Sequence, residues 1–219
     1  HLRHVYDAAV KGADAEIGGI IDAIEDAGLN ERTIIVVTSD HGEEFWEHGN
    51  LGHSRGLYET LVAIPLVVAG PGIPTGRVAR PVSLVDIAPT LLRLAGRSQD
   101  PRMQGRPLPW PDQDSGEGPL VYSEVGTPLA HMDALRMGRW KLIVSARGTR
   151  RELFDLSADP GETAEASATQ AKALEVMSLR RDSLRGGMEA LRSALGDADG
   201  AEVTEATRAA LEALGYVDD

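Results

Sequence analysis

The sequence predicts a mixed α/β fold: part of a mixed, mainly parallel sheet flanked by helices, plus a small C-terminal antiparallel sheet with a long helix. Three observations predict this class. The apolar run Thr33–Ser39 lacks alternation, which is typical of a strand buried on both faces. A helical pattern precedes it, and a helix followed by a buried strand is half of a βαβ unit. Beyond residue 118, short strand-like segments lead into a long stretch rich in Ala, Leu and Arg.

The first half of the chain alternates helices with apolar strands. Residues Val5–Leu29 are expected to form a helix that stops at Gly28. Its apolar positions share one stripe, namely Val10, Ala13, Ile17, Ile20, Ile21 and Ile24. A short helix at 57–62, a second apolar strand at Ile64–Ala69 and a helix at 83–95 with Ser83 as its N-cap complete this half.

The second half predicts a separate small sheet. Its strands are expected at Leu120–Val125, Ala134–Met137, Trp140–Val144 and Glu152–Phe154, with tight turns at 138–139 and 147–149. We therefore divide the chain into an α/β part at 1–96, a linking loop at 97–118, a small antiparallel unit with its helix at 119–196, and a tail helix at 197–219.

Composition excludes some classes of partner. The chain has 219 residues, 42% of them hydrophobic, and 22 basic minus 34 acidic side chains give a net charge of −12. This balance argues against a nucleic-acid partner. No apolar run approaches the roughly 20 residues that a membrane span needs. There is no cysteine, so no disulfide can form.

The candidate site begins where the Thr33–Ser39 strand ends. Asp40 and His41 follow it directly, and ligands in open α/β sheets bind just past the carboxyl ends of the strands. A carboxylate oxygen and an imidazole nitrogen together suit a divalent metal. The loop that follows holds two further histidines, His48 and His53, and a loop of this length in a compact domain is usually functional or disordered.

Several blocks along the chain together resemble the second half of a sulfatase, in the alkaline phosphatase superfamily. They are Ser39-Asp40-His41-Gly42-Glu43-Glu44, Glu47-His48-Gly49, Gly52-His53, Leu57-Tyr58-Glu59, Ile64-Pro65-Leu66-Val67-Val68, Gly70-Pro71-Gly72, Asp86-Ile87-Ala88-Pro89-Thr90-Leu91-Leu92, Gln104-Gly105-Arg106, Gly138-Arg139-Trp140-Lys141-Leu142-Ile143, Glu152-Leu153-Phe154-Asp155-Leu156 and Leu214-Gly215-Tyr216. Their order and spacing cover nearly the whole chain.

The resemblance implies roles for four residues. Asp40 and His41 would be ligands of the active-site cation, which is expected to be calcium, with zinc or manganese left open by the histidine. His53 and Arg55 would contact the ester: His53 as hydrogen-bond donor, acid or metal ligand, and Arg55 through its planar fork. The family more usually has Lys or His near this position, so Arg55 is a departure. The alternative to an ester-binding role for Arg55 is an ion pair with Glu43, Glu44 or Glu59. His48 either has a functional role in the site or orders the loop.

The family's nucleophile is missing from this sequence. It is a formylglycine made from Cys or Ser in a Cys/Ser-x-Pro-x-Arg motif, and no such motif occurs here. The chain thus resembles a C-terminal portion, expected to be inactive alone and to need the N-terminal half of the same enzyme or to self-associate. Expected substrates are small-molecule or glycan sulfate esters, and relatives suggest a periplasmic or secreted location. The alternatives are a phosphodiesterase or phosphonate monoester hydrolase of the same superfamily, and a non-catalytic metal- or anion-binding remnant.

Overall fold

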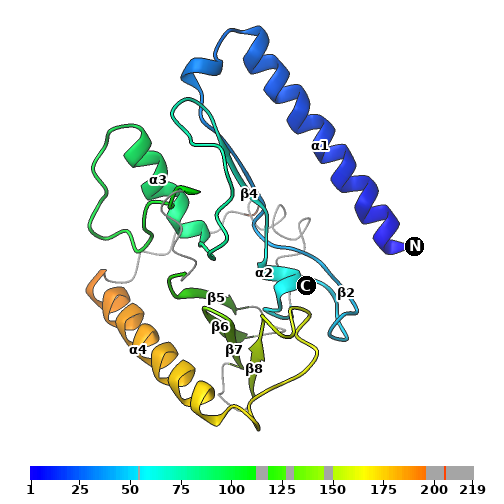
Figure 1. Cartoon of the computed structure of the whole chain (residues 1–219), viewed down its shortest axis with the longest axis vertical. Coiled ribbons are helices and arrows are strands. Elements are labelled where there is room, and N and C mark those ends of the chain that lie inside the picture. Colours follow the sequence, from blue (N-terminus) through cyan, green and yellow to red (C-terminus); the bar gives the residue numbers. More distant parts are fainter. Residues whose placement is uncertain (54, 112–117, 127–130, 146–149, 196–204, 206–219) are drawn as a thin grey trace.

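The computed structural model describes residues 1–53, 55–111, 118–126, 131–145, 150–195 and 205. Figure 1 shows two parts: a long helix, a narrow sheet and a shorter helix above, and a second sheet with a long helix below. The upper sheet has two strands and the lower sheet has four. The predicted α/β class is confirmed, including the small antiparallel sheet and its long helix. Within the described residues, no helix is both long and apolar enough to cross a membrane.

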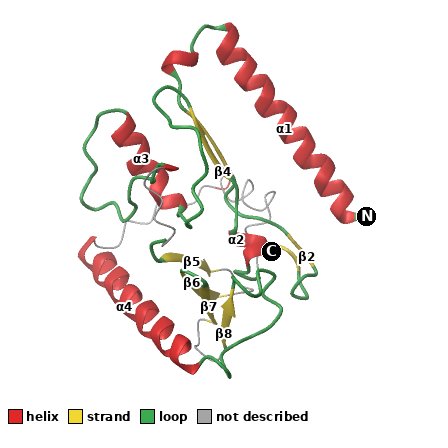
Figure 2. Cartoon of the chain, viewed as in Figure 1, coloured by secondary structure: helices red, strands yellow, loops and turns green. Residues whose placement is uncertain are grey.

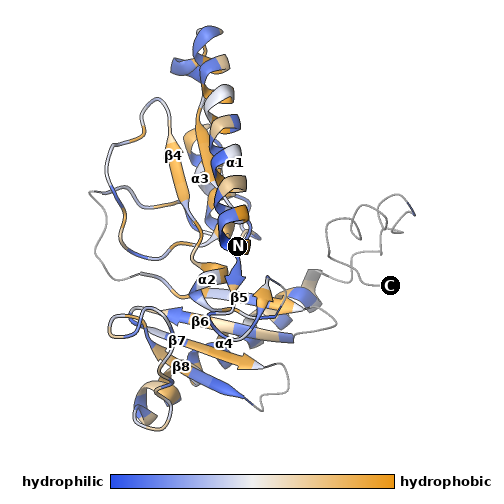
Figure 3. Ribbon diagram, turned by 90° about the vertical axis from the view of Figure 1, so that its right-hand side faces the viewer, coloured by the Kyte–Doolittle hydropathy of each residue, from blue (hydrophilic) through white to orange (hydrophobic). Residues whose placement is uncertain are grey.

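The first helix, α1 (Leu2–Asp26), forms where the sequence predicts it. It ends in a Schellman motif: Gly28 has φ +66°, its N–H donates to the Glu25 carbonyl, and the Leu29 N–H donates to Ile24. The apolar stripe is present, but no residue of α1 is buried, and Ile20 is 62% exposed. Figure 3 shows this helix alternating between apolar and polar colours. The stripe therefore has no covering partner among the described residues.

The two predicted apolar strands pair with each other. β1 (Ile35–Thr38) and β4 (Leu66–Ala69) run antiparallel, with Val36 opposite Val68. This corrects the expectation of mainly parallel neighbours for these strands. A parallel neighbour needs a crossover that carries the chain back to the start of the first strand. This connection instead turns back near the end of β1, through a small hairpin, β2 (Glu44–Phe45) and β3 (Leu51–Gly52), and one helical turn, α2 (Glu59–Val62).

The expected burial of the first strand on both faces is wrong for the described chain. Among the strands that the structure describes, β1 has a hydrogen-bonded neighbour on one edge only, and none of its residues is buried. The apolar side chains of β1 need to be buried against other parts of a protein, and β4 alone does not bury them.

A short 3-10 turn, η1 (Asn30–Arg32), joins α1 to β1, and a second one, η2 (Leu84–Asp86), leads into α3 (Ile87–Leu94). Ser83 caps this segment as predicted, in a reciprocal capping box with Asp86. The second oxygen of Asp86 accepts the Arg106 N–H at 2.8 Å, and the Thr90 hydroxyl accepts the Leu108 N–H at 2.8 Å. These bonds hold the described part of the 97–118 loop against α3.

The lower sheet has the order β5-β6-β7-β8, all antiparallel (Figure 2). Its strands are β5 (Val121–Gly126), β6 (His131–Met137), β7 (Trp140–Ser145) and β8 (Arg151–Asp155), close to the predicted ranges. The β6–β7 turn places Gly138 at φ +56°, as a tight hairpin requires. The turn at 147–149 and the tail helix, apart from residue 205, lie outside the described residues.

The main core lies between this sheet and α4 (Ala171–Leu195). It is built from fully buried side chains of β6, β7, β8 and α4, namely Leu135, Leu142, Val144, Leu153 and Met177. A buried ion pair adds to it: the Arg181 guanidinium of α4 donates to both oxygens of Asp133 on β6, at 2.5 and 2.6 Å. The sheet is thus a rigid support for the loops that reach it from the upper part.

Candidate functional site

The residues that follow β1 are held in place by backbone contacts. The Ser39 hydroxyl donates to the His41 carbonyl at 2.6 Å, and the His41 N–H donates to Asp40 Oδ1 at 2.9 Å. The Gly42 N–H donates to the Leu61 carbonyl of α2 at 2.8 Å. A Cβ at Gly42 would overlap the Thr60 carbonyl oxygen, so this close approach requires glycine. The strand end therefore lies directly against α2.

Asp40 and His41 each present one atom that can bind a cation. Asp40 is exposed, with 72% of its side chain accessible, and its Oδ2 lies 3.7 Å from His41 Nε2. His41 Nδ1 lies 2.9 Å from the Gly42 carbonyl, which only accepts, so Nδ1 carries the ring proton and the Nε2 lone pair is free. One ion with bonds of about 2.0–2.5 Å can contact both atoms. The donor set fits half of a metal site.

The charge state of Asp40 also suits a ligand. Burial acts to raise its pKa, but hydrogen bonds to the carboxylate, first among them the one from the His41 backbone N–H, outweigh it, so the pKa of Asp40 lies below its usual value. Across the described ranges, no group of three or more His, Cys, Asp or Glu side chains is arranged to hold a metal ion.

His53 lies beside this pair. Its ring stacks on His41 with centroids 4.2 Å apart and planes 23° apart. Its Nδ1 lies 3.5 Å from Oε1 of Glu43, and each of these two buried atoms has no hydrogen-bond partner. The structure thus brings Asp40, His41 and His53 together and adds Glu43, which the sequence did not single out.

Arg55 is exposed, and none of the ion pairs considered as the alternative to its binding role forms. Glu43 faces His53, Glu44 faces His48, and Glu59 binds Arg136 and Lys141. Among the described ion pairs, none includes Arg55. Its guanidinium therefore remains available, two positions after His53.

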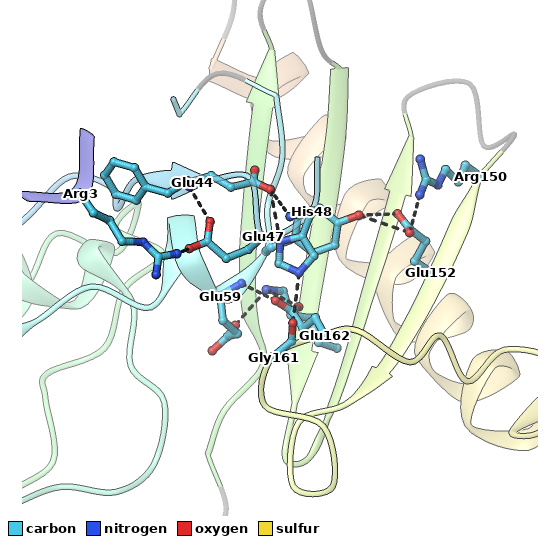
Figure 4. Close-up of polar contacts among 12 residues, drawn as sticks. Arg3, Glu44, Glu47, His48, Glu59, Arg150, Glu152, Gly161 and Glu162 are labelled. Carbon is cyan, nitrogen blue, oxygen red and sulfur yellow. Dashed lines mark hydrogen bonds and ion pairs between the residues drawn. The ribbon is translucent and has the colours of Figure 1, made fainter. Parts of the chain in front are cut away.

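Three charged residues at the start of α2 and beside it form a cluster that sequence reasoning missed. Lys141 on β7 lies 2.9 Å from carboxylate oxygens of both Glu59 and Glu162, and the other oxygen of Glu162 accepts the Glu59 N–H at 2.5 Å. Figure 4 shows Glu59 and Glu162 side by side below the His48 ring. This cluster fastens α2, and through Gly42 the strand end, to the lower sheet. The one local sign of it is a lysine inside the apolar run Trp140–Val144.

Comparison with known proteins places the chain in a family. The sulfatase family model matches residues 1–97. Arylsulfatase K of Mus musculus is 36% identical over 176 residues, which are 74% of this chain and 32% of that protein. Choline-sulfatase of Rhizobium meliloti (strain 1021) is 33% identical over 170 residues, 73% of this chain and 32% of that protein.

Solved structures agree with this assignment. A protein bound to its substrate D-glucosamine-2-N,6-O-disulfate aligns with a TM-score of 0.68 and 26% identity, over 81% of this chain and 39% of that one. The phosphonate monoester hydrolase of Agrobacterium radiobacter aligns with a TM-score of 0.66 and 28% identity, over 80% and 39%.

The class that these comparisons define is that of sulfatase-like α/β proteins. Over part of its length, the chain is a member of the sulfatase family. That family in general uses a divalent metal and a formylglycine. The chain spans about a third of the length of the curated relatives it matches, 32% for the mouse protein.

Proposed function

We propose that the protein carrying this chain hydrolyses a sulfate ester with the help of a divalent cation, and that Asp40 and His41 supply part of the metal site. The observation that carries the proposal is the free Nε2 of His41, 3.7 Å from an exposed Asp40 carboxylate oxygen at a strand end. Calcium is the expected ion because carboxylates are hard ligands, while the imidazole also suits zinc or manganese. When bound, the cation would stabilise negative charge on the sulfuryl oxygens.

His53 and Arg55 contact the ester in this proposal. His53 stacks on a proposed metal ligand, so its ring lies within reach of a group bound there. It donates a proton or a hydrogen bond to the leaving oxygen, and Oε1 of Glu43 lies 3.5 Å from its Nδ1. The exposed Arg55 guanidinium presents a planar fork to the remaining oxygens. The nucleophile, a formylglycine, is expected in the N-terminal half of the same enzyme.

The likeness to a phosphonate monoester hydrolase keeps a second ester class open. A substrate panel on the complete protein separates the two: aryl sulfates, phosphonate monoesters and phosphodiesters are compared by kcat/KM. The proposal predicts the highest value for a sulfate ester. A phosphonate or phosphodiester preference would replace sulfate by the second candidate, and a protein inactive on the whole panel would be a metal- or anion-binding remnant.

A variant series tests the role of His53. In the complete protein, His53→Gln is expected to slow esters with poor leaving groups more than esters with good ones, because only the former need protonation. General acid catalysis contributes about 10²–10⁴-fold, so the gap between the two ends of the series should approach that range. His131→Gln, an exposed histidine of β6, is the control. Equal slowing across the series would remove His53 from the acid role.

The exposed apolar surfaces support further proposals. The uncovered stripe of α1 and the single-sided β1–β4 pair are surfaces that the N-terminal half of the enzyme would cover, and without it the chain would self-associate. The division at 1–96, 97–118, 119–196 and 197–219 is part of this proposal. A glycan or small-molecule sulfate ester outside the cytoplasm, in the periplasm or after secretion, is the expected setting.

A further inference from the structure

A cavity of about 590 Å³ lies between the upper part of the molecule and the lower sheet. Its upper wall is formed by β4 and the residues that join α2 to β4, and its floor by β5, β6 and β7. Segments 73–84 and 108–111 form its sides. Sites for small molecules are typically cavities of about 300–1,000 Å³, mostly apolar and with a few polar groups. The size of this cavity is therefore that of a small-molecule site.

Most of the lining is apolar. Val67 of β4 and Leu84 line the cavity and are 56% and 41% exposed, so the described chain leaves apolar surface uncovered there. Leu108, Trp110 and Val121 add apolar surface from two further segments. Burial of such surface is favourable in proportion to its area, so the lining favours a ligand with an apolar body.

The charged side chains of the lining are mainly basic. Those in the described part of the chain are Arg77, Arg80, Arg136, Lys141 and Glu59. Glu59 is bound by Arg136 and by Lys141, in both cases at 2.9 Å. Among the described ion pairs, none includes Arg77 or Arg80. This excess of positive charge occurs in a chain with a net charge of −12, so the cavity is suited to an anion.

Two guanidinium nitrogens of the lining residues are buried without a hydrogen-bond partner, namely Nε of Arg80 and Nε of Arg136. An arginine side chain stays protonated in proteins, so each Nε carries an N–H that can only donate. Nη1 of Arg136 already donates to Glu59 at 2.9 Å. Buried donors in native proteins are nearly always paired, so the two N–H groups indicate an acceptor that the described chain does not supply.

We propose that this cavity, which we call the Arg80 cavity, binds an organic oxyanion, meaning a carboxylate or sulfonate-type head group on an apolar body. The guanidinium groups of Arg80 and Arg136 contact the head group, because their planar forks match the paired oxygens of such an anion. The apolar walls at β4 and 108–111 contact the body.

The Arg80 cavity does not include the residues proposed to bind the metal or the ester. Its lining contains neither Asp40 nor His41, and neither His53 nor Arg55. The proposal therefore does not rest on the proposed function. Its test measures binding, so a failure of the sulfatase assay would leave the result unchanged.

The test is calorimetric titration of the complete protein with naphthalene-2-carboxylate, and with naphthalene-2-carboxamide as a neutral probe of the same shape. Naphthalene-2-sulfonate shows which head group the cavity prefers. Arg80→Gln removes a cation that forms no described ion pair, so the fold should be retained. Arg97→Gln, at an exposed position outside the cavity, is the matched control. Asp40→Asn shows whether the probes bind at the candidate metal site instead.

We expect the carboxylate or the sulfonate to bind at least about tenfold more tightly than the amide, as for a hydrogen bond to a charged group. Arg80→Gln should remove this preference, whereas Arg97→Gln and Asp40→Asn should keep it. If Arg80→Gln does not fold, the anions and the amide are compared in the parent and in Asp40→Asn, and these two proteins decide.

Three results would overturn the proposal. In the first, the anions and the amide bind equally. In the second, the preference for the anions is lost in Asp40→Asn and kept in Arg80→Gln, which places the probes at the candidate metal site. In the third, no probe binds, as expected if the N-terminal half of the enzyme fills the cavity.

Discussion

Lys141→Met perturbs the charge cluster that joins the candidate site to the lower sheet. The Lys141 side chain is 2% exposed, and its ammonium lies 2.9 Å from carboxylate oxygens of both Glu59 and Glu162. Methionine has a similar length and no charge, so it fills the space and removes the cation. Glu162, which is 1% exposed, then has no cationic partner among the described residues.

The size of the effect follows from which carboxylate loses its partner. Removing one member of a buried ion pair costs about 3–5 kcal/mol. Glu59 keeps Arg136 at 2.9 Å and Glu162 keeps the Glu59 N–H, so we expect a loss near the lower end, about 3 kcal/mol. Since a domain of this kind has about 5–15 kcal/mol of unfolding free energy, the change is readily measured.

Urea unfolding of the variants provides the assay. Lys172→Met, at an exposed position of α4, is the matched control and should stay within about 0.5 kcal/mol of the parent. Adding Glu162→Gln to Lys141→Met should recover about 1–2 kcal/mol, since the amide still accepts the Glu59 N–H but carries no charge. A Lys141→Met loss below about 1 kcal/mol, or a double variant no more stable than the single one, would refute this reasoning.

Two further predictions concern the same region. Gly42→Ala should destabilise the chain by about 1–3 kcal/mol in urea unfolding, because its Cβ overlaps the Thr60 carbonyl and separates the strand end from α2; an unchanged midpoint would contradict the close approach. Burial and the charge of Glu152 raise the pKa of Tyr58 from 10 to about 12, so its contribution to stability is complete below pH 10 and is lost between pH 10 and 12. Tyr58→Phe should remove this part of the alkaline fall in unfolding free energy, and a fall of the same size in both proteins would count against it.

Local signals made much of the fold predictable. The 3.6-residue stripe and Gly28 located α1, and the capping pattern of Ser83 and Asp86 located the start of η2 and α3. The turn at Gly138 set the β6–β7 hairpin. The direction and cover of β1 could not be read the same way, because an apolar run shows that a strand requires cover but not which segment provides it.

In the candidate site, too, the local features could be predicted from the sequence and the contacts between distant segments could not. Asp40 and His41 could be predicted as candidate ligands because a strand end is a local feature, and the structure leaves one donor atom of each free. Lys141 and Glu162 meet Glu59 across 82 and 103 residues of chain, and no periodicity encodes such a contact. The partners of His48 are likewise divided, since Glu44 is local and Gly161 lies 113 residues away.

Metal affinity tests the central claim most directly. In the complete protein, the dissociation constant for calcium, and then for zinc and manganese, is measured by calorimetry before and after Asp40→Asn, which retains the hydrogen bond from the His41 N–H. The control is Asp22→Asn, at an exposed position of α1. We predict at least about a tenfold loss, equivalent to about 1.4 kcal/mol, for Asp40→Asn and none for the control. Equal affinity in all three proteins would show that the ion binds elsewhere and would contradict the assignment of Asp40 and His41.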